Sequence, residues 1–291
     1  ATAQKLAKSV VTVKLVVKLK AGGREEEQKL EVVGTVIDPS GLTIVAASAI
    51  DPTIVLKALM GAQMRSMSVD SDVSETNIVL DDGTEVPSDV VLKDPDLDLA
   101  FIRPRDASVK FDESVHLKPR GTAPQPLEDV FVLGRMGRLE NRATSVSTGA
   151  VRASVKGPRT FYILDNEVVA GNIGCIAYDA SGAPLGVIVL KVATDAGSDQ
   201  SGGMNRATSM LMGGGMRDTA IPIMRPVEDI LDDAAQAKTA KAPEKKAAVE
   251  KKDEGKGGDE DGDGDEMDGG KHEAPHGSTG TAAPGKPGED K

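Results

Sequence analysis

One glycine-rich segment, from Asp165 to Ile176, gathers the residue types and spacings most suited to chemistry. Gly171 and Gly174 allow positive φ, so the backbone here can turn tightly and come close to a ligand. The segment also holds Cys175, the one cysteine of the chain, whose thiolate form would be a nucleophile. Strand-like runs at residues 160–164 and 184–190 flank it. The pattern predicts a tight loop between two strands.

A thiol needs an activating base or a positive environment before it can attack a carbonyl, and neither is visible near Cys175. The histidines are His116, in a polar connection, and His272 and His276 towards the C-terminal end. We therefore expect Cys175 to be a buried, small apolar residue, and a reactive thiol is the alternative.

The elements that must position this loop read as β-strands, because their residues are β-branched or alternate between apolar and polar. Strands are expected at 9–19, 30–37 and 42–50, the last two joined by the turn at residues 38–41. Asp82-Gly83 predicts a hairpin within 77–92. Later strands are expected near 130–137, 144–153 and 220–223, followed by a helix from Pro226 to about Ala237.

The glycine-rich loop resembles the nucleophile loop of HtrA/Deg-type serine proteases, which have the chymotrypsin-like fold. That family writes the loop as Thr-Asp-Ala-Ala-Ile-Asn-Pro-Gly-Asn-Ser-Gly-Gly-Pro-Leu, and Asp165, Gly171, Asn172 and Gly174 stand at matching offsets. Ile173 takes the place of the nucleophilic serine. Because isoleucine has no heteroatom, it cannot attack a carbonyl.

Two further segments resemble the motifs that carry the family's other catalytic residues. Residues 34–50 resemble Gly-x-Val-Ile-Asp-Pro-x-Gly-Leu-Ile-Leu-Thr-Asn-Ala-His-Val-Val, and in that register Ser48 replaces the histidine. A serine hydroxyl has no useful basicity near neutral pH. Residues 94–103 resemble Asp-x-x-x-Asp-Leu-Ala-Leu-Leu-Lys, with Asp98 at the catalytic aspartate. The resemblance implies a degenerate triad of Ser48, Asp98 and Ile173.

The resemblance covers roughly residues 9–232 and implies an all-β, chymotrypsin/trypsin-like double β-barrel with a short C-terminal helix. A protease-like domain is expected at 1–233, with barrels at about 9–115 and 125–233. Residues 234–291 are expected to be a disordered, low-complexity charged tail, because they cannot bury enough apolar surface to offset the entropy of ordering. Such a tail leaves no room for the PDZ domain that many HtrA/Deg proteins carry.

The function implied is that of a catalytically inactive homologue, a pseudoprotease that binds an extended peptide or a protein partner. The loop Gly171, Asn172, Ile173 and Gly174 is the expected binding loop, with the amides of Gly171 and Ile173 as an oxyanion-like pocket. The resemblance also implies a homo-oligomer such as a trimer, or an assembly with an active relative, and an extracytoplasmic location in the periplasm or cell envelope. The alternative is an active endopeptidase with a non-standard site at Cys175 or a serine such as Ser147. A third hypothesis is a structural envelope protein that binds through its acidic tail.

Composition narrows the remaining function classes. The formal net charge of -11 argues against a general nucleic-acid binder, which needs a basic surface for phosphate. No apolar run is long enough to span a bilayer as a helix. Residues 259–264 fit the first half of an EF-hand loop, but Gly270 stands where the bidentate glutamate belongs, so no metal site is predicted. No cofactor is expected.

Overall fold

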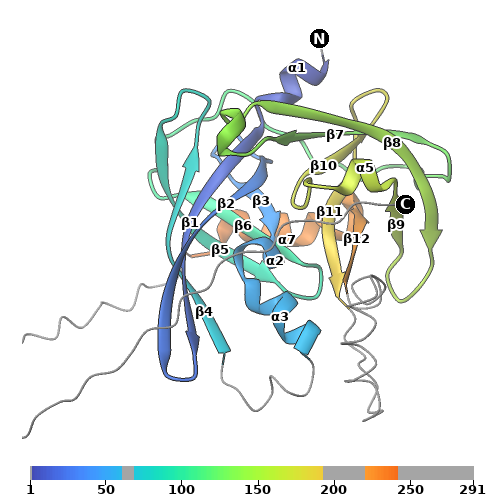
Figure 1. Cartoon of the computed structure of the whole chain (residues 1–291). Helices are drawn as coiled ribbons and strands as arrows, with labels where there is room; N and C mark the ends of the chain where they lie inside the picture. Colours follow the sequence, from blue (N-terminus) through green and yellow to red (C-terminus); the bar gives the residue numbers. More distant parts are fainter. Residues whose placement is uncertain (1, 61–68, 193–219, 242–291) are drawn as a thin grey trace, which may run out of the picture. The chain divides into compact units, whose positions relative to one another are not determined.

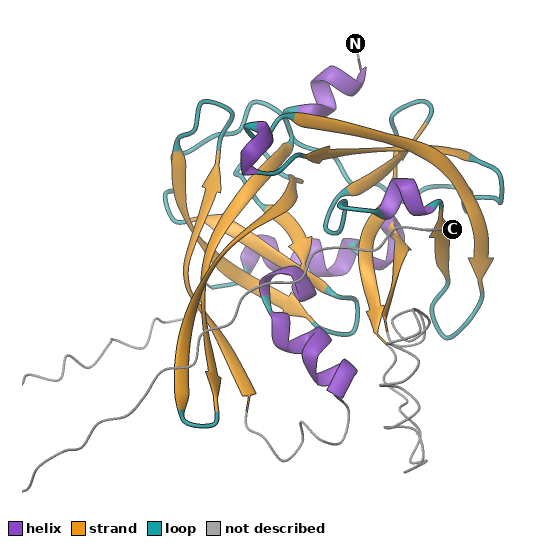
Figure 2. Cartoon of the chain, viewed as in Figure 1, coloured by secondary structure: helices purple, strands orange, loops and turns teal. Residues whose placement is uncertain are grey.

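The structure, a computed structural model, describes residues 2–60, 69–192 and 220–241. These residues form two closed β-barrels of six strands each (Figures 1 and 2). All neighbouring strands within each barrel pair antiparallel. The predicted all-β double barrel is confirmed.

The first barrel has the strand order β1-β2-β3-β6-β5-β4. Alternate residues of its long first strand, Val11, Val13, Leu15 and Val17, are buried in its core, as the apolar spacing of a half-buried strand requires. The strands are β1 (Val10–Ala21), β2 (Arg24–Val36), β3 (Thr43–Ala46), β4 (Val69–Val79), β5 (Glu85–Asp94) and β6 (Leu99–Pro104).

The second barrel has the strand order β10-β11-β12-β9-β8-β7. Its core contains Val132, Val151, Leu185 and Ile188, together with Cys175. The strands are β7 (Asp129–Arg135), β8 (Thr144–Val155), β9 (Phe161–Leu164), β10 (Ile176–Asp179), β11 (Pro184–Val192) and β12 (Ala220–Pro226).

Short helices connect and close the barrels. The last helix, α7, packs Ala234 and Ala237 into a core cluster that takes residues from both barrels, such as Phe101 of β6 and Val187 of β11. The barrels are therefore joined by apolar packing as well as by the chain. The helices are α1 (Thr2–Ala7), α2 (Ala47–Ile50), α3 (Pro52–Met60), η1 (Arg138–Glu140), α5 (Asn166–Val169), η2 (Val227–Asp229) and α7 (Leu231–Thr239).

The structure differs from the sequence prediction at three places. The strand expected at 42–50 ends at Ala46 and continues as the helical turn α2, because the Asp98 carbonyl accepts a hydrogen bond from the Ala47 amide. The loop expected after β9 begins with the helical turn α5. The helix expected from Pro226 to about Ala237 is present as η2 and α7, but α7 runs to Thr239, past residue 234 where the tail was expected to begin, and Arg103 binds its last carbonyls. Residues 242–291 lie outside the described residues.

Candidate functional site

Asp98 stands at the seam between the barrels, one residue before β6. A turn leads into it, in which the Asp94 carboxylate accepts the amides of Asp96 and Leu97 at 2.8 and 3.0 Å. Asp98 itself has φ 58, in the left-handed region that aspartate tolerates better than most residues. This local geometry turns the backbone where β6 begins.

Ser48 lies directly against Asp98. The Ser48 amide donates to Asp98 Oδ1 at 2.6 Å, and the Ser48 hydroxyl donates to Asp98 Oδ2 at 2.9 Å. The Leu190 amide of β11 donates to the same Oδ2 at 2.7 Å. The carboxylate therefore ties α2 of the first barrel to β11 of the second.

Asp98 is almost fully enclosed, with 4% of the residue's surface exposed. Burial raises the pKa of Asp98 to about 6, against the three hydrogen bonds from Leu190 and Ser48, which favour the ionised form. Arg225 of β12, itself buried, adds a smaller attraction that lowers this pKa. Arg225 was not predicted as a site residue, because nothing in its local sequence pattern distinguishes a buried arginine from a surface one.

Ile173 lies in the loop after α5, on the second barrel's side of the seam. It is half-buried and packs against the core of that barrel, as does Val33 of β2. The next residue, Gly174, has φ 91 and no room for a side chain, because an added Cβ would lie 2.9 Å from the Val33 carbonyl oxygen. Gly174 thus brings the loop into contact with the first barrel.

The side chain of Asn172 fixes this loop from inside. It is buried, and its Nδ2 donates to the Val168 carbonyl at 2.7 Å and to Ser147 Oγ at 3.1 Å. A Cβ on Gly134 would lie 2.4 Å from Asn172 Oδ1, so the glycine makes room for this amide. Asn172, predicted as part of a binding loop, is here a structural support of that loop.

The loop amides are used unequally. The amides of Asn172 and Gly174 donate to the carbonyls of Val169 and Ile188 at 3.2 and 2.7 Å. Within the described part of the chain, no hydrogen bond is formed by the amides of Gly171 and Ile173. Those two donors remain free to bind an acceptor that approaches the loop.

Cys175, Ser147 and His116 do not assemble with one another. Cys175 is fully buried, and burial raises the pKa of its thiol to about 12. Ser147 accepts a hydrogen bond from Asn172. His116, the one histidine among residues 2–60, 69–192 and 220–241, is exposed on a connection. Cys175 is therefore a core residue in this fold.

The structure holds neither a membrane helix nor a metal cluster within its described residues. None of its helices there has the length and apolarity needed to cross a membrane. The same residues contain no group of three or more His, Cys, Asp or Glu that could hold a metal ion. The EF-hand-like residues 259–264 lie outside them.

The family comparison agrees with this geometry. The family model described as a trypsin-like peptidase domain matches residues 33–187, which include Ser48, Asp98 and Ile173 and make up more than half of the chain. The chain belongs to the trypsin-like peptidase family. No curated protein matches this trypsin-like chain.

In this family, the residues at the seam between the barrels correspond to the catalytic residues of active members. In active trypsin-like peptidases an aspartate orients a histidine, and the histidine takes the proton of the attacking serine. This trypsin-like chain joins Ser48 to Asp98 by two hydrogen bonds and carries Ile173 on the other side of the seam.

Proposed function

We propose that this chain is a catalytically inactive trypsin-like homologue of HtrA/Deg type, which binds an extended peptide or a protein partner at the former substrate cleft. The observation that carries the proposal is the buried hydrogen bond from the Ser48 hydroxyl to Asp98 at 2.9 Å. Asp98 occupies the position of the family's catalytic aspartate. The group that it contacts is the Ser48 hydroxyl, which has no useful basicity and cannot act as the general base.

The nucleophile position supports the same conclusion. Ile173 offers only carbon atoms, and the neighbouring Cys175 is fully buried with its pKa raised to about 12. A thiol with this pKa is almost entirely protonated near neutral pH, so it is a poor nucleophile. Two of the three groups that acyl transfer requires are missing together.

A binding role has its own structural support. Strand β11 pairs with β12 from Gly186 to Val192, but its other edge pairs with β10 only from Pro184 to Val187. Beyond Val187, no described strand pairs with that other edge, but Ile188 bonds there with Gly174 and Cys175, and the Leu190 amide bonds with Asp98. An extended peptide can add through backbone hydrogen bonds to the end of this edge, from the Leu190 carbonyl to Val192, without any catalytic group. The free amides of Gly171 and Ile173 would then act as binding donors.

The test is a search for new chain ends. The purified chain is incubated with an unstructured protein and a diverse peptide mixture, and new termini are read by mass spectrometry, with Cys175→Ala in parallel. We expect no new termini from either protein. Cleavage by the unaltered chain that survives purification controls would overturn the proposal, and its loss in Cys175→Ala would identify the thiol as the nucleophile.

A second experiment tests whether the absence of the histidine and serine side chains alone accounts for the expected lack of cleavage. Ser48→His with Ile173→Ser restores the family's residues around the retained Asp98. Gain of cleavage in the double variant, but not in Ser48→His alone, is the expected result. Equal activity of the double variant and the unaltered chain would contradict the proposal.

Assembly and location are proposed from the family resemblance alone. A homo-oligomer such as a trimer, or a mixed assembly with an active relative, would be detected by sedimentation velocity. An extracytoplasmic location would be tested by cell fractionation. Truncation after residue 241 keeps α7 and the carbonyls that Arg103 binds, and it removes the tail. Peptide binding that survives truncation supports the cleft, whereas complete loss would favour the tail as the binding element.

A further inference from the structure

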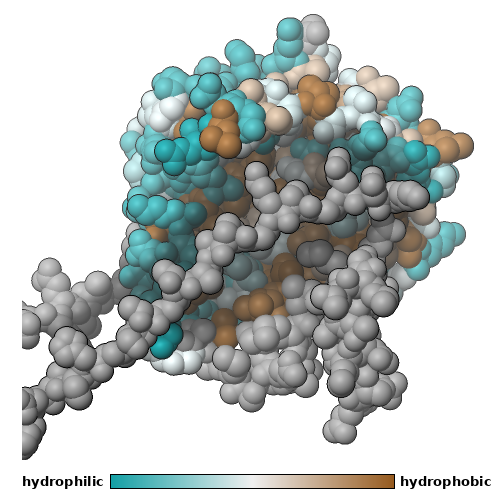
Figure 3. All heavy atoms as spheres, in the orientation of Figure 1, coloured by the Kyte–Doolittle hydropathy of each residue, from teal (hydrophilic) through white to brown (hydrophobic). Residues whose placement is uncertain are grey.

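Exposed apolar side chains gather on one face of the second barrel. Among the described residues, four of the five exposed large apolar side chains lie on β8 or the turns beside β7, namely Leu127, Met136, Leu139 and Val146. They expose between 45% and 95% of their surface, and the fifth, Leu56, belongs to α3. Brown areas appear along the upper edge of Figure 3, the edge along which β7 and β8 run in Figure 1.

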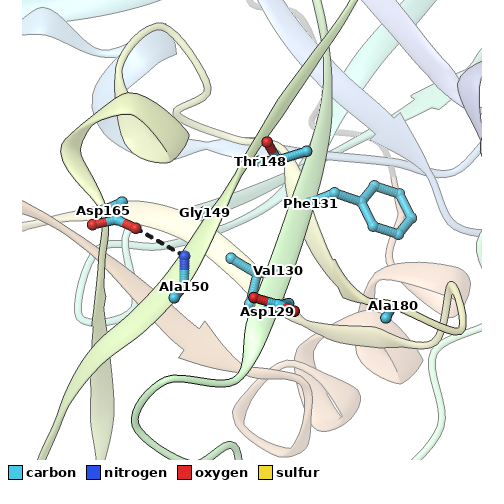
Figure 4. Close-up of a pocket in the computed structure, with 8 residues that line it drawn as sticks. All are labelled: Asp129, Val130, Phe131, Thr148, Gly149, Ala150, Asp165 and Ala180. Atoms are coloured by element: carbon cyan, nitrogen blue, oxygen red, sulfur yellow. Dashed lines mark hydrogen bonds between the residues drawn. The ribbon is translucent and has the colours of Figure 1, made fainter.

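Two hollows lie on the same pair of strands. The larger, about 530 Å³, is lined by Val130 and Phe131 of β7, by residues 148–150 of β8, and by the acidic side chains of Asp129 and Asp165 (Figure 4). The smaller, about 330 Å³, lies between α1 and the strands, and Leu133 and Val146 line it. We call this surface, with its four exposed apolar residues, the β7–β8 face.

The strand edges decide how a partner can bind here. Strand β7 pairs along one edge with β8 and along the other with β10. Helix α5 packs beside β8. A partner strand therefore has no free edge of β7 to join, and a partner that covers the outer surface of β7 and β8 makes its contacts through side chains. An amphipathic helix meets that requirement, because its apolar stripe contacts a surface without using its backbone groups.

Charge differs between the two ends of the face. At the end where β7 begins, Asp165 is held by Arg152 and Glu128 by Arg120. Arg120 is shared with Asp179, and Asp129 forms no ion pair with a described residue, so this end carries two more negative than positive charges.

At the other end, Arg135 binds Asp81 and Arg142 binds Glu31. Lys8, Arg138 and Glu140 form no ion pair with any described residue, and together they carry one net positive charge. Arg138 also lies beside Glu31 and, with Arg142, helps to lower the pKa of that carboxyl group. The face thus exposes apolar side chains at intervals along its length, with Thr144 and Thr148 between them, and its ends are oppositely charged.

We propose that the β7–β8 face binds an amphipathic helix of a partner protein, with acidic residues at the Arg138 end and basic residues at the Asp129 end. From Thr144 to Ala150 the strand spans about 20 Å, which matches a helix of about 13 residues. Helices favour acidic residues near their N-terminus and basic residues near their C-terminus. The N-terminus of the bound helix therefore lies at the Arg138 end.

The test uses two synthetic 16-residue peptides, each with a leucine stripe at helical spacing. One has glutamates in its first turn and lysines in its last turn, and the other has these charges exchanged. Binding to the full chain is measured by fluorescence anisotropy. We expect the first peptide to bind, and the second to bind about three- to tenfold more weakly, because each exposed ion pair contributes modestly.

Variants locate the binding on the face. Val146→Glu combined with Leu139→Glu is expected to weaken binding of the first peptide by at least about tenfold, since it puts charge into the apolar contact. Leu56→Glu, at the exposed apolar residue on α3, is the matched control and is expected to leave binding unchanged. All three positions are exposed, so the fold should persist, and circular dichroism checks this.

Three results would overturn the proposal. One is binding that Leu56→Glu and the double variant affect equally, and another is no binding of either peptide. The third is concentration-dependent self-association in sedimentation velocity that Val146→Glu abolishes, because the face would then belong to a second copy of the chain. None of these results bears on catalysis, so the proposed function stands or falls separately.

Discussion

At the scale of single residues, Asp98 is the side chain on which most of the site depends. Its two oxygens accept hydrogen bonds from α2 and from β11 in a setting with almost no solvent. Such bonds to a buried carboxylate are expensive to leave unmade. The Ser48 hydroxyl, which stands where the family has its histidine base, therefore acts as a structural hydrogen-bond donor.

Ser48→Ala should destabilise the fold measurably for this reason. The substitution removes the hydroxyl donor at 2.9 Å but leaves the backbone donors in place. We expect the free energy of unfolding to fall by about 2 kcal/mol in urea titrations at neutral pH. Ser154→Ala, at an exposed position of β8, is the control and should stay within about 0.5 kcal/mol. Equal effects would show that the Ser48 hydroxyl does not support Asp98.

Substitutions at two glycines of the binding loop would distinguish the cost of backbone strain from the cost of steric crowding. Gly171 has φ 74 with open space around its missing Cβ, whereas Gly174 has φ 91 and the Val33 carbonyl oxygen 2.9 Å away. Gly171→Ala should cost about 1 kcal/mol from strain alone. Gly174→Ala should cost about 3 kcal/mol, because the barrels must also move apart at this point. Thermal unfolding of both variants makes the comparison, and similar losses would contradict the close contact.

Some residues of the site could be predicted from the sequence and others could not. The identity and order of Ser48, Asp98 and Ile173 were accessible from local motifs, and the structure brings the first two into direct hydrogen bonding. Arg225 was not accessible, because it joins the site through the barrel packing. The face formed by Leu127, Met136, Leu139 and Val146 was also missed, since exposure of an apolar residue depends on the tertiary fold.

At the scale of elements, the strands were easier to predict than their ends. Alternation in β1 and the Asp82-Gly83 turn between β4 and β5 encode regular local structure that pairing then reinforces. The helical turn α2 depends on hydrogen bonds to Asp98, fifty residues away along the chain. Helix α7 likewise runs past 234 through contacts with β6. Such distant partners leave no periodicity in the local sequence.

Arg103 should therefore control the last helix. Its guanidinium donates to the carbonyls of Ala237, Lys238 and Ala240 at 3.3, 2.9 and 2.6 Å. These carbonyls have no intrahelical donors of their own, so Arg103 acts as a C-terminal cap. Arg103→Met should lower the free energy of unfolding by about 2 kcal/mol. It should also speed hydrogen exchange of the α7 amides.

The control for Arg103 is the neighbouring arginine of the same barrel. Arg105 pairs with Asp89 near the surface at 2.9 Å, and Arg105→Met should cost less than about 1 kcal/mol. Its effect on α7 exchange should be absent. Faster exchange of α7 in both variants, or in neither, would contradict the capping role.

At the scale of the whole molecule, the buried carboxyl group of Asp98 and the half-buried one of Asp233 couple the barrels to pH. Asp98 joins α2 to β11, and Asp233 lies on α7, whose alanines pack between residues of both barrels. Burial raises the pKa of each to about 6, and for Asp233 the neighbouring Asp94 adds to the effect. Both groups therefore hold a proton more tightly in the folded chain than in the unfolded one.

The consequence is a loss of stability as pH rises. A raised folded pKa contributes stability that is fully present below the unfolded value near 3.8 and disappears as pH passes about 6. For Asp98 the shift corresponds to about 3 kcal/mol. We expect the free energy of unfolding to fall between pH 4 and pH 7 in urea titrations.

Asp98→Asn, which cannot titrate, should be less stable at pH 4, because an amide cannot accept from all three donors. Its slope across this range should be smaller, with Asp233 and Asp229, whose pKa values burial also raises, supplying the remainder. Asp98→Asn with Asp233→Asn should flatten the slope further. If the dependence of unfolding free energy on pH were unchanged in the double variant, other groups would be responsible for it, and protonation of Asp98 at the seam would not affect stability.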